Sequence, residues 1–197
     1  MLTRAILGLE DGISVDKVYP LKDENGWTFR PELSTFDGEF SEDSINQKKH
    51  ITEIYELSGK SSSSLPILFD KKTNKVVNND FLEIAKLLNS QLSKFGHGNP
   101  DLYPQELRTE IDALNDWIKN DVVDGAQKAG FCKTQEEYNI AYKKYFEALE
   151  ALDGIFRVRK FLCGDEISLS DILLFPTIFR HDQVYHGRFL LNKKFVK

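Results

Sequence analysis

The sequence predicts a protein of two parts, an α/β half followed by an all-helical half. Short strand-like and helix-like pieces alternate from residue 1 to about residue 95. The string Gly96-His97-Gly98-Asn99-Pro100 then interrupts every pattern, as is typical of a domain boundary. Beyond it, apolar residues recur every three or four positions, which is the period of an amphipathic helix. We therefore expect one domain over residues 1–95 and a second over residues 101–197.

The α/β half is expected to begin with a helix and a strand. The apolar residues of the helix share one face: Leu2, Ala5, Ile6 and Leu9. Residues 13–19 then alternate apolar and polar side chains, the period of a β-strand, and Pro20 closes them. A polar stretch over 22–49 has no clear period. Its two large aromatic residues, Trp27 and Phe29, are expected to lie against other parts of the molecule.

The rest of this half predicts a helix, two strands and a second helix. Residues 51–57 favour a short helix that ends at Gly59. Residues 65–69 and 76–77 favour two buried strands, joined by a charged turn at 70–75. An amphipathic helix follows, and its apolar residues are Leu82, Ile84, Ala85, Leu87, Leu88 and Leu92.

The second half predicts three helices with clear start signals. Pro104 suits the first turn of the first helix. Thr134-Gln135-Glu136-Glu137 and Ser168-Leu169-Ser170-Asp171 are capping boxes that start the other two, and Ile167 can act as a hydrophobic staple. The expected apolar positions of the first helix are Leu107, Ile111, Leu114, Ile118 and Val122. Those of the second are Tyr138, Ala141, Tyr142, Tyr145, Phe146, Leu149 and Leu152.

Composition and charge exclude several classes of protein. The 197 residues hold 26 Lys and Arg against 31 Asp and Glu, a net charge of −5, which argues against nucleic acid or an anionic membrane as the partner. No apolar run approaches the ~18 residues of a membrane span, and the first ten residues do not resemble a signal peptide. The two cysteines, Cys132 and Cys163, form no C-x-x-C pair, so we expect a reducing, cytoplasmic location.

Several strings resemble the Xi-class glutathione transferases, the glutathionyl-hydroquinone reductases. The matching strings cover residues 25–29, 65–72, 77–79, 101–104, 128–131, 162–165, 179–185 and 192–194. The resemblance implies a thioredoxin-like domain joined to a helical domain, with glutathione as co-substrate and no metal. It also implies that a cysteine thiolate attacks a glutathionyl-hydroquinone, and that a second glutathione resolves the resulting mixed disulfide.

The chain departs from this family where the reaction would start. The family's nucleophile lies in a Cys-Pro-Trp type motif after the first strand, whereas this sequence begins at the following helix. We therefore expect an incomplete thioredoxin-like sheet that lacks its central strand, between residues 13–19 and 65–69. Each buried backbone group left unpaired would cost ~1–3 kcal/mol. The C-terminus is also short for the family. Three hypotheses stay open: a partial product of a reductase gene, a non-catalytic transferase-like binding module, or an unstable relic.

The resemblance implies a glutathione site in the first half. Pro66 matches the cis-proline of thioredoxin-like folds, so the backbone of Leu65 would contact the cysteinyl part of glutathione. Trp27 matches a tryptophan that packs beside glutathione, or it is a core aromatic that pins the long loop. Asp80 would hold the ammonium group of glutathione, or it is simply the N-cap of the following helix. Phe81 stands where the family has a serine hydroxyl.

The resemblance also implies an acceptor pocket in the second half. Tyr103 and Tyr185 would donate phenolic hydrogen bonds to a quinol oxygen. The alternative for each is a tyrosine between the domains whose hydroxyl is already satisfied. The expected partners are glutathione or a glutathionyl conjugate, and a homodimer is among the possibilities.

The remaining reactive residues predict no site of their own. Cys132 and Cys163 neither follow a strand nor start the right helix, so we interpret them as structural or incidental thiols. His181 and His186 are five positions apart and do not share one helical face well. No metal-binding pattern accompanies them, so a metal site is not expected.

Overall fold

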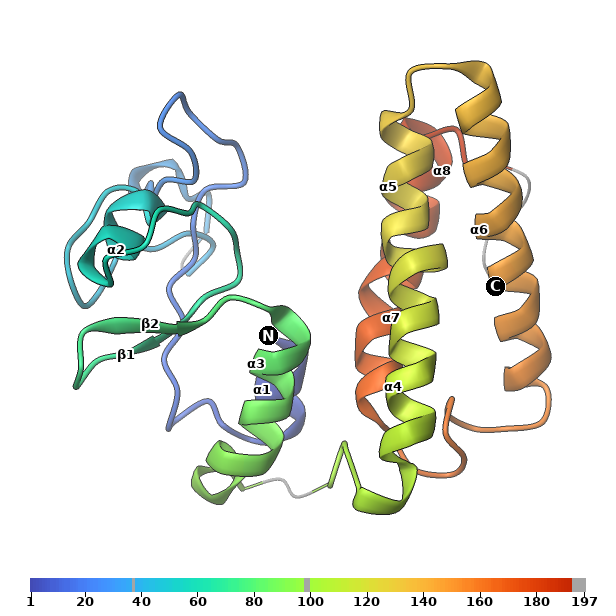
Figure 1. Cartoon of the computed structure of the whole chain (residues 1–197). Helices are drawn as coiled ribbons and strands as arrows, with labels where there is room; N and C mark the ends of the chain where they lie inside the picture. Colours follow the sequence, from blue (N-terminus) through green and yellow to red (C-terminus); the bar gives the residue numbers. More distant parts are fainter. Residues whose placement is uncertain (37, 98–99, 193–197) are drawn as a thin grey trace. The chain divides into compact units, whose positions relative to one another are not determined.

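The computed structural model describes residues 1–36, 38–97 and 100–192. Gly98 and Asn99 of the predicted boundary, and the terminal residues Lys193, Lys194 and Lys197, lie outside the described residues. The chain divides into two compact units, drawn in Figure 1. One unit is Leu7–Gly98, and the other joins Met1–Ile6 to Asn99–Lys197. We call them the N-terminal unit and the helical unit and describe each by itself.

The N-terminal unit is built on two helices and a small antiparallel sheet. Helix α2 spans Ile51–Leu57, strands β1 and β2 span Leu68–Asp70 and Lys75–Asn78, and helix α3 spans Phe81–Leu87. A 3-10 turn, Pro31–Leu33, precedes them, and α3 continues as a π-helical turn, Leu88–Leu92, and a 3-10 turn, Ser93–Phe95. The order of elements after residue 50 therefore agrees with the sequence prediction.

The core of this unit lies between α2 and the sheet. Its buried members are Phe29, Ile51, Ile54, Tyr55 and Val76, and partly buried side chains pack against them, namely Val18, Trp27, Leu65, Ile67 and Phe69. Trp27 and Phe29 therefore lie against the core, as expected for large aromatics in a polar stretch. The long segment before α2 is thereby tied to the helix and the sheet.

The predicted strand over residues 13–19 is wrong. Among the described residues, the backbone of 14–19 bonds only to Ser41 and Thr28 and forms no strand ladder. The amide of Ser41 donates to the carbonyl of Lys17 at 2.9 Å, and the amide of Tyr19 donates to that of Thr28 at 2.8 Å. A period-two pattern makes a strand only where a neighbouring strand supplies the matching bonds. The predicted strand over 65–69 also shortens, to Leu68–Asp70.

The two edges of the sheet differ. On the outer edge of β2, the amide of Val76 donates to Ser58 Oγ at 2.7 Å, and its carbonyl accepts from Lys60 Nζ at 3.3 Å. Phe69 is the partner of Val76 across the sheet, so its own amide and carbonyl face the opposite edge. That edge of β1 has no neighbouring strand among the described residues. Side chains of Ser58 and Lys60 therefore protect the edge at β2, whereas the edge at β1 has no strand partner among the described residues.

The first helix forms, but its predicted apolar face is wrong. Helix α1 spans only Leu2–Ile6, and within it Thr3 is buried while Ala5 is exposed. Gly8 adopts φ +62°, which ends the helix and turns the chain. Leu7 and Leu9 are both fully buried. They follow the last helical residue, so their burial does not depend on the 3.6-residue period of the helix.

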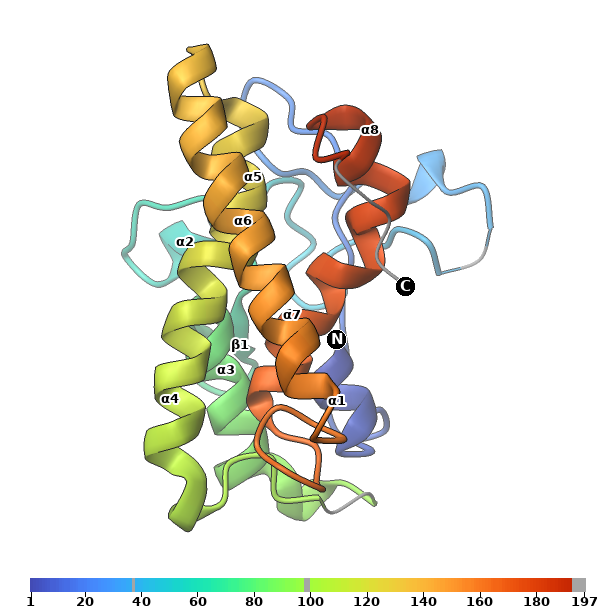
Figure 2. The same ribbon diagram turned by 90° about the vertical axis from the view of Figure 1, so that its right-hand side faces the viewer.

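The helical unit consists of one long rod and two helices packed along it. The rod comprises a 3-10 turn Gln105–Leu107, helix α4 Arg108–Trp117, a π-helical segment Ile118–Val123 and helix α5 Asp124–Phe131. Helix α6, Gln135–Phe156, runs beside α5, and helix α7, Leu169–Arg180, runs beside α4 (Figures 1 and 2). A π-helical turn, His181–Tyr185, and the short helix α8, His186–Arg188, complete the unit. No helix among the described residues is long and apolar enough to span a membrane.

Both predicted capping boxes are confirmed. At α6, Thr134 Oγ1 accepts from the amide of Glu137 at 3.2 Å, and the Glu137 carboxylate accepts from the amide of Thr134 at 3.3 Å. At α7, the Asp171 carboxylate accepts from both the amide and the hydroxyl of Ser168. Of the apolar residues predicted on α6, Tyr145, Phe146 and Leu152 are buried. The others are half-buried, because the face that contacts the rod is narrower than the apolar stripe.

A charged cluster surrounds the start of α2. His50 Nε2 lies 2.9 Å from Asp23 Oδ2, and Glu53 Oε2 accepts from the amides of His50 and Lys49. The hydrogen bond with His50 is the main cause that lowers the pKa of Asp23 below its usual value. The backbone amide of His50 lowers the pKa of Glu53 in the same direction.

These two carboxyl groups predict an acid-sensitive N-terminal unit. A carboxyl whose pKa is lower in the folded state stabilises that state at neutral pH, and this stabilisation is lost as the pH falls below about 4. Thermal melts between pH 7 and pH 3 should therefore show a falling Tm, with a shallower fall for Glu53→Gln. The exposed Glu42→Gln is the control and should keep the wild-type slope. Equal slopes for both variants would contradict the prediction.

Candidate functional site

The proposed glutathione contacts Leu65 and Pro66 lie in the loop that enters β1. The Leu65–Pro66 peptide bond is cis, as the resemblance implies. Ser64 pins this loop, because its Oγ lies 2.9 Å from the Tyr55 hydroxyl and accepts from Asn79 Nδ2 at 2.7 Å. Tyr55 is a buried core residue of α2. The loop is therefore held between the core and the end of β2, beside the start of α3.

Asp80 is the N-cap of α3, which confirms the alternative role predicted for it. Its Oδ1 accepts from the amides of Leu82 and Glu83 at 2.9 and 3.0 Å. Its own amide donates to Asn78 Oδ1 at 2.8 Å. The second oxygen, Oδ2, makes no hydrogen bond with the described residues, and the side chain is exposed. One carboxylate oxygen therefore caps the helix, and the cap leaves the other oxygen unused.

Trp27 has the second of its two expected roles, a core aromatic that pins the long loop. The side chain is half-buried against the core cluster, and its carbonyl accepts from the amide of Ile51 at 3.0 Å. Lys22 Nζ lies 4.9 Å from the centre of the indole ring, within cation–π range. The residue pins the long loop to α2 while part of its ring stays accessible.

The two tyrosines of the predicted acceptor pocket lie in the helical unit and differ in their contacts. The Tyr103 hydroxyl donates to Asp112 Oδ2 at 2.6 Å, and the Arg108 guanidinium lies 5.1 Å from its ring centre. Because a phenol has one hydroxyl proton, Tyr103 can donate to a quinol oxygen only if its hydrogen bond to Asp112 breaks. Tyr185 is half-buried, and its ring stacks on Phe189 with the centroids 5.3 Å apart and the planes within 4°.

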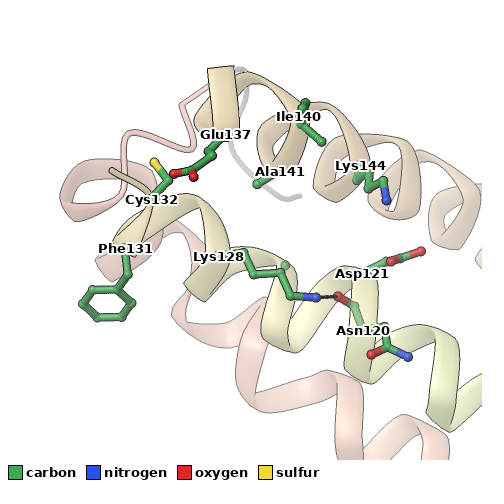
Figure 3. A pocket seen from close by; sticks show the side chains of 10 residues that line it. Asn120, Asp121, Lys128, Phe131, Cys132, Glu137, Ile140, Ala141 and Lys144 are labelled. Carbon is green, nitrogen blue, oxygen red and sulfur yellow. Dashed lines mark hydrogen bonds between the residues drawn. The ribbon is translucent and has the colours of Figure 1, made fainter. Parts of the chain in front are cut away.

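A cavity of about 410 Å³ lies between α5 and α6, and Figure 3 shows it from close by. Its lining includes Phe131, Cys132, Ile140 and the aliphatic part of Lys128, whose Nζ donates to the carbonyl of Asn120 at 3.2 Å. None of the predicted site residues is among the described residues that line it. The cavity is thus distinct from the site that the resemblance implies.

The contacts of the two cysteine thiols do not favour either as the nucleophile. Cys132 Sγ donates to the carbonyl of Ala129 at 3.1 Å, and burial raises the pKa of Cys163. A nucleophilic thiol needs a lowered pKa, which a helix N-terminus or a neighbouring cation normally supplies. In the described ranges, no group of three or more His, Cys, Asp or Glu side chains could hold a metal ion.

Comparison with known proteins identifies the family. Residues 135–195 match the family model of the glutathione S-transferase C-terminal domain. Over 98% of its length the chain is 36% identical to the glutathionyl-hydroquinone reductases PcpF of Sphingobium chlorophenolicum and YqjG of Escherichia coli. The solved structure of glutathione transferase Xi 1 from Trametes versicolor is 35% identical and superposes with a TM-score of 0.89. That match covers 98% of this chain and 68% of the other.

The chain belongs to the Xi-class glutathione transferases. The fold class predicted for it, an incomplete thioredoxin-like domain followed by a helical transferase domain, is confirmed. The glutathione-bound structure of E. coli YqjG superposes with a TM-score of 0.91 over 98% of this chain and 63% of that one. The chain spans 61% of PcpF and 58% of YqjG, about three fifths of these curated relatives.

Sequence analysis missed two polar clusters of this Xi-class chain. One is the group formed by Ser64, Asn79 and Tyr55, which positions the loop at Leu65. The other is a buried hydrogen bond between Tyr145 and His181. The available signal for the second was that Tyr145 was expected in the core, where a tyrosine hydroxyl needs a partner.

Proposed function

We propose that this chain binds glutathione and glutathionyl-hydroquinones as part of a glutathionyl-hydroquinone reductase. The observation that supports this most is the pinned loop at Leu65 and Pro66, which Ser64 and Asn79 tie to the start of α3, next to the exposed carboxylate of Asp80. A backbone edge beside an anionic group suits a peptide-like ligand that carries an ammonium group. PcpF and YqjG are themselves named glutathionyl-hydroquinone reductases.

In the proposed reaction, a thiolate attacks the glutathionyl sulfur of the conjugate. The carbon–sulfur bond breaks, a sulfur–sulfur bond forms, and the ring carbon takes up a proton to give the free hydroquinone. The thiolate of a second glutathione then displaces the first thiol and leaves as glutathione disulfide. Tyr103 and Tyr185 would hydrogen-bond the quinol oxygens. Because the Cys132 thiol donates to the carbonyl of Ala129 and burial raises the pKa of Cys163, we assign the attacking thiol to neither of them.

The second candidate function is a binding module without catalysis. Phe81, at the first position of α3, favours it, because a large exposed ring occupies the position of the family's serine hydroxyl. One activity measurement distinguishes the two candidate functions. Joining a strand and a Cys-Pro segment ahead of Met1 should give glutathionyl-hydroquinone reduction, and the same fusion with Ser for Cys should not. A folded, inactive Cys fusion would favour the binding module.

Asp80 allows a sharp test of glutathione binding. Asparagine is as good an N-cap as aspartate but carries no charge, so Asp80→Asn should keep the Tm of the wild type. It should weaken glutathione binding by about tenfold, the effect of losing one charge-assisted hydrogen bond. Isothermal titration of glutathione into the 197-residue chain measures this, and Glu56→Gln, on the exposed side of α2, is the control. Unchanged affinity would leave Asp80 as a cap alone, and undetectable binding to the wild type would overturn the proposed function.

We also propose a cytoplasmic location and a homodimer. Cys132 and Cys163 are free and half-buried, which suits a reducing compartment. The dimer rests on the family resemblance, and sedimentation velocity of the purified chain tests it.

A further inference from the structure

Helix α6 holds the segment that carries Tyr185 at two points. At the first, the Tyr145 hydroxyl and His181 Nδ1 form a hydrogen bond of 2.8 Å. At the second, the Tyr138 hydroxyl donates to the carbonyl of Leu190 at 2.7 Å. Tyr138 and Tyr145 are two helical turns apart and therefore lie on the same face of α6. Tyr185 lies between the two attachment points along the chain.

The first attachment point is fully buried. Tyr145 and His181 are both 0% exposed, and their rings are nearly parallel, with centroids 5.6 Å apart. The ring of Phe146 meets His181 edge-on at 6.1 Å. Burial, with smaller contributions from Tyr185 and Asp182, raises the pKa of Tyr145, so its hydroxyl keeps its proton at neutral pH. Removing one partner of such a buried bond leaves the other without its hydrogen bond, so the bond favours one placement of His181.

His181 in turn sets the position of Tyr185. The two residues are the ends of one π-helical turn, which the amide of His186 closes by donating to the carbonyl of His181. The Tyr185 carbonyl accepts from the amides of Phe189 and Leu191 at 3.1 and 3.2 Å. Residues four apart in such a turn lie on nearly the same side, and π-helical turns are frequent at functional sites. The direction of the Tyr185 side chain therefore depends on where His181 is anchored.

The ring of Tyr185 also packs against an aromatic neighbour. Phe189, on which Tyr185 stacks, meets the ring of Phe131 at 5.4 Å. Phe189 also lies over Gly130, where a Cβ atom would overlap its ring. The Tyr185 ring thus packs on Phe189, and the Tyr145–His181 bond anchors the other end of the π-helical turn that carries it.

We propose that the buried Tyr145–His181 hydrogen bond is a positioning pair that presents Tyr185 to the hydroquinone part of a glutathionyl-hydroquinone. This role rests on the proposed function, in which Tyr185 contacts the quinol. His181 is then a positioning residue, acting through Tyr185 rather than on the substrate. Its removal should affect the hydroquinone part of the ligand and leave the glutathione part unaffected.

The test compares two ligands on two variants of the full chain. Tyr145→Phe removes only the hydroxyl, and it should weaken binding of an S-glutathionyl-1,4-hydroquinone by about tenfold while glutathione binding changes by less than about twofold. Tyr142→Phe is the matched control. It lies on the same helix with its ring 4.7 Å from Phe146, and both affinities should stay at the wild-type value. Isothermal titration of the wild type and both variants gives all six constants.

A second measurement reports Tyr185 itself. In chains labelled with ¹³C-tyrosine, the ring signals of Tyr185, assigned with Tyr185→Phe, should move in Tyr145→Phe and stay in place in Tyr142→Phe. Unmoved signals together with an unchanged ratio of the two affinities would overturn the proposal. If the wild type binds the conjugate no better than glutathione, the acceptor role of Tyr185 fails, and the NMR signals alone decide the positioning.

A third variant separates the hydrogen bond from ring packing and guards against a misfolded Tyr145→Phe. His181→Asn keeps an acceptor close to the position of Nδ1, so it should retain conjugate binding within about threefold. The positioning pair is supported if a folded His181→Asn variant retains conjugate binding and the Tyr145→Phe variant loses it. If His181→Asn weakens conjugate binding as much as Tyr145→Phe does, the effect comes from the packing of the imidazole. That result would overturn the role of the hydrogen bond.

Discussion

Replacing Asp171 by alanine is expected to lower the free energy of unfolding by about 2–4 kcal/mol, because several buried donors lose their acceptor together. Asp171 Oδ2 accepts from the amide and the hydroxyl of Ser168 at 2.9 and 2.8 Å, and Oδ1 accepts from the amide of Leu162 at 2.9 Å. Ser168 is 2% exposed and Leu162 is 0% exposed, so water cannot readily replace the carboxylate. Asp171 thus completes the capping box of α7, in which Ser168 is the N-cap, and also fastens the preceding loop to the helix.

Urea unfolding followed by circular dichroism measures this effect. Asp171→Asn keeps one acceptor oxygen and should lose about half as much stability as the alanine variant. Asp165→Ala, an exposed change in the same loop, should stay within about 0.5 kcal/mol of the wild type. An alanine variant at 171 as stable as the wild type would show that the cap contributes nothing.

Gly96→Ala is expected to destabilise the N-terminal unit by at least about 2 kcal/mol, a typical cost of overpacking against atoms that cannot yield. A Cβ atom on Gly96 would overlap the carbonyl oxygen of Leu7 and approach Leu9 Cδ2 to 3.2 Å. Leu7 and Leu9 are both fully buried, and the amide of His97 donates to the carbonyl of Gly8 at 3.3 Å. The close approach of two backbone segments therefore requires glycine here.

The control for this change is a glycine-to-alanine substitution that is expected to stabilise the chain. Gly154 lies inside α6, and a Cβ atom there would meet no atom within 4 Å. Gly154→Ala should therefore stabilise the chain by about 0.5–1 kcal/mol through helix propensity alone. Thermal melts of the two variants give the comparison, and a Tm for Gly96→Ala at or above that of the wild type would refute the close-approach argument.

Local signals predicted the helices more reliably than the strands. The capping boxes at Thr134 and Ser168 act within one helical turn, so the residues that decide them are neighbours in the sequence. The pattern over 13–19 was equally clear but produced no strand, because a strand depends on a partner far along the chain. The apolar face predicted for α1 failed for a related reason: Gly8 ends the helix before the pattern does.

The residues of the candidate site could be named from the sequence, but their contacts could not. Trp27, Leu65, Pro66, Asp80, Tyr103 and Tyr185 came from matching strings, whose residues are identifiable one position at a time. Sequence analysis could name two roles for Asp80, and the structure places it as a helix cap with one carboxylate oxygen exposed. His181 was considered only as a metal ligand, although its contact is with a tyrosine 36 positions earlier.

By itself, the sequence determined the family and the starts of the long helices. These depend on strings and spacings that are complete within a few residues. Only the tertiary structure decided that Ser64 and Asn79 hold the loop at Leu65, that Asp171 also binds Leu162, and that Tyr145 anchors His181. Each of these contacts joins side chains that are distant in sequence, and their energy comes from burial, which exists only once the chain has folded.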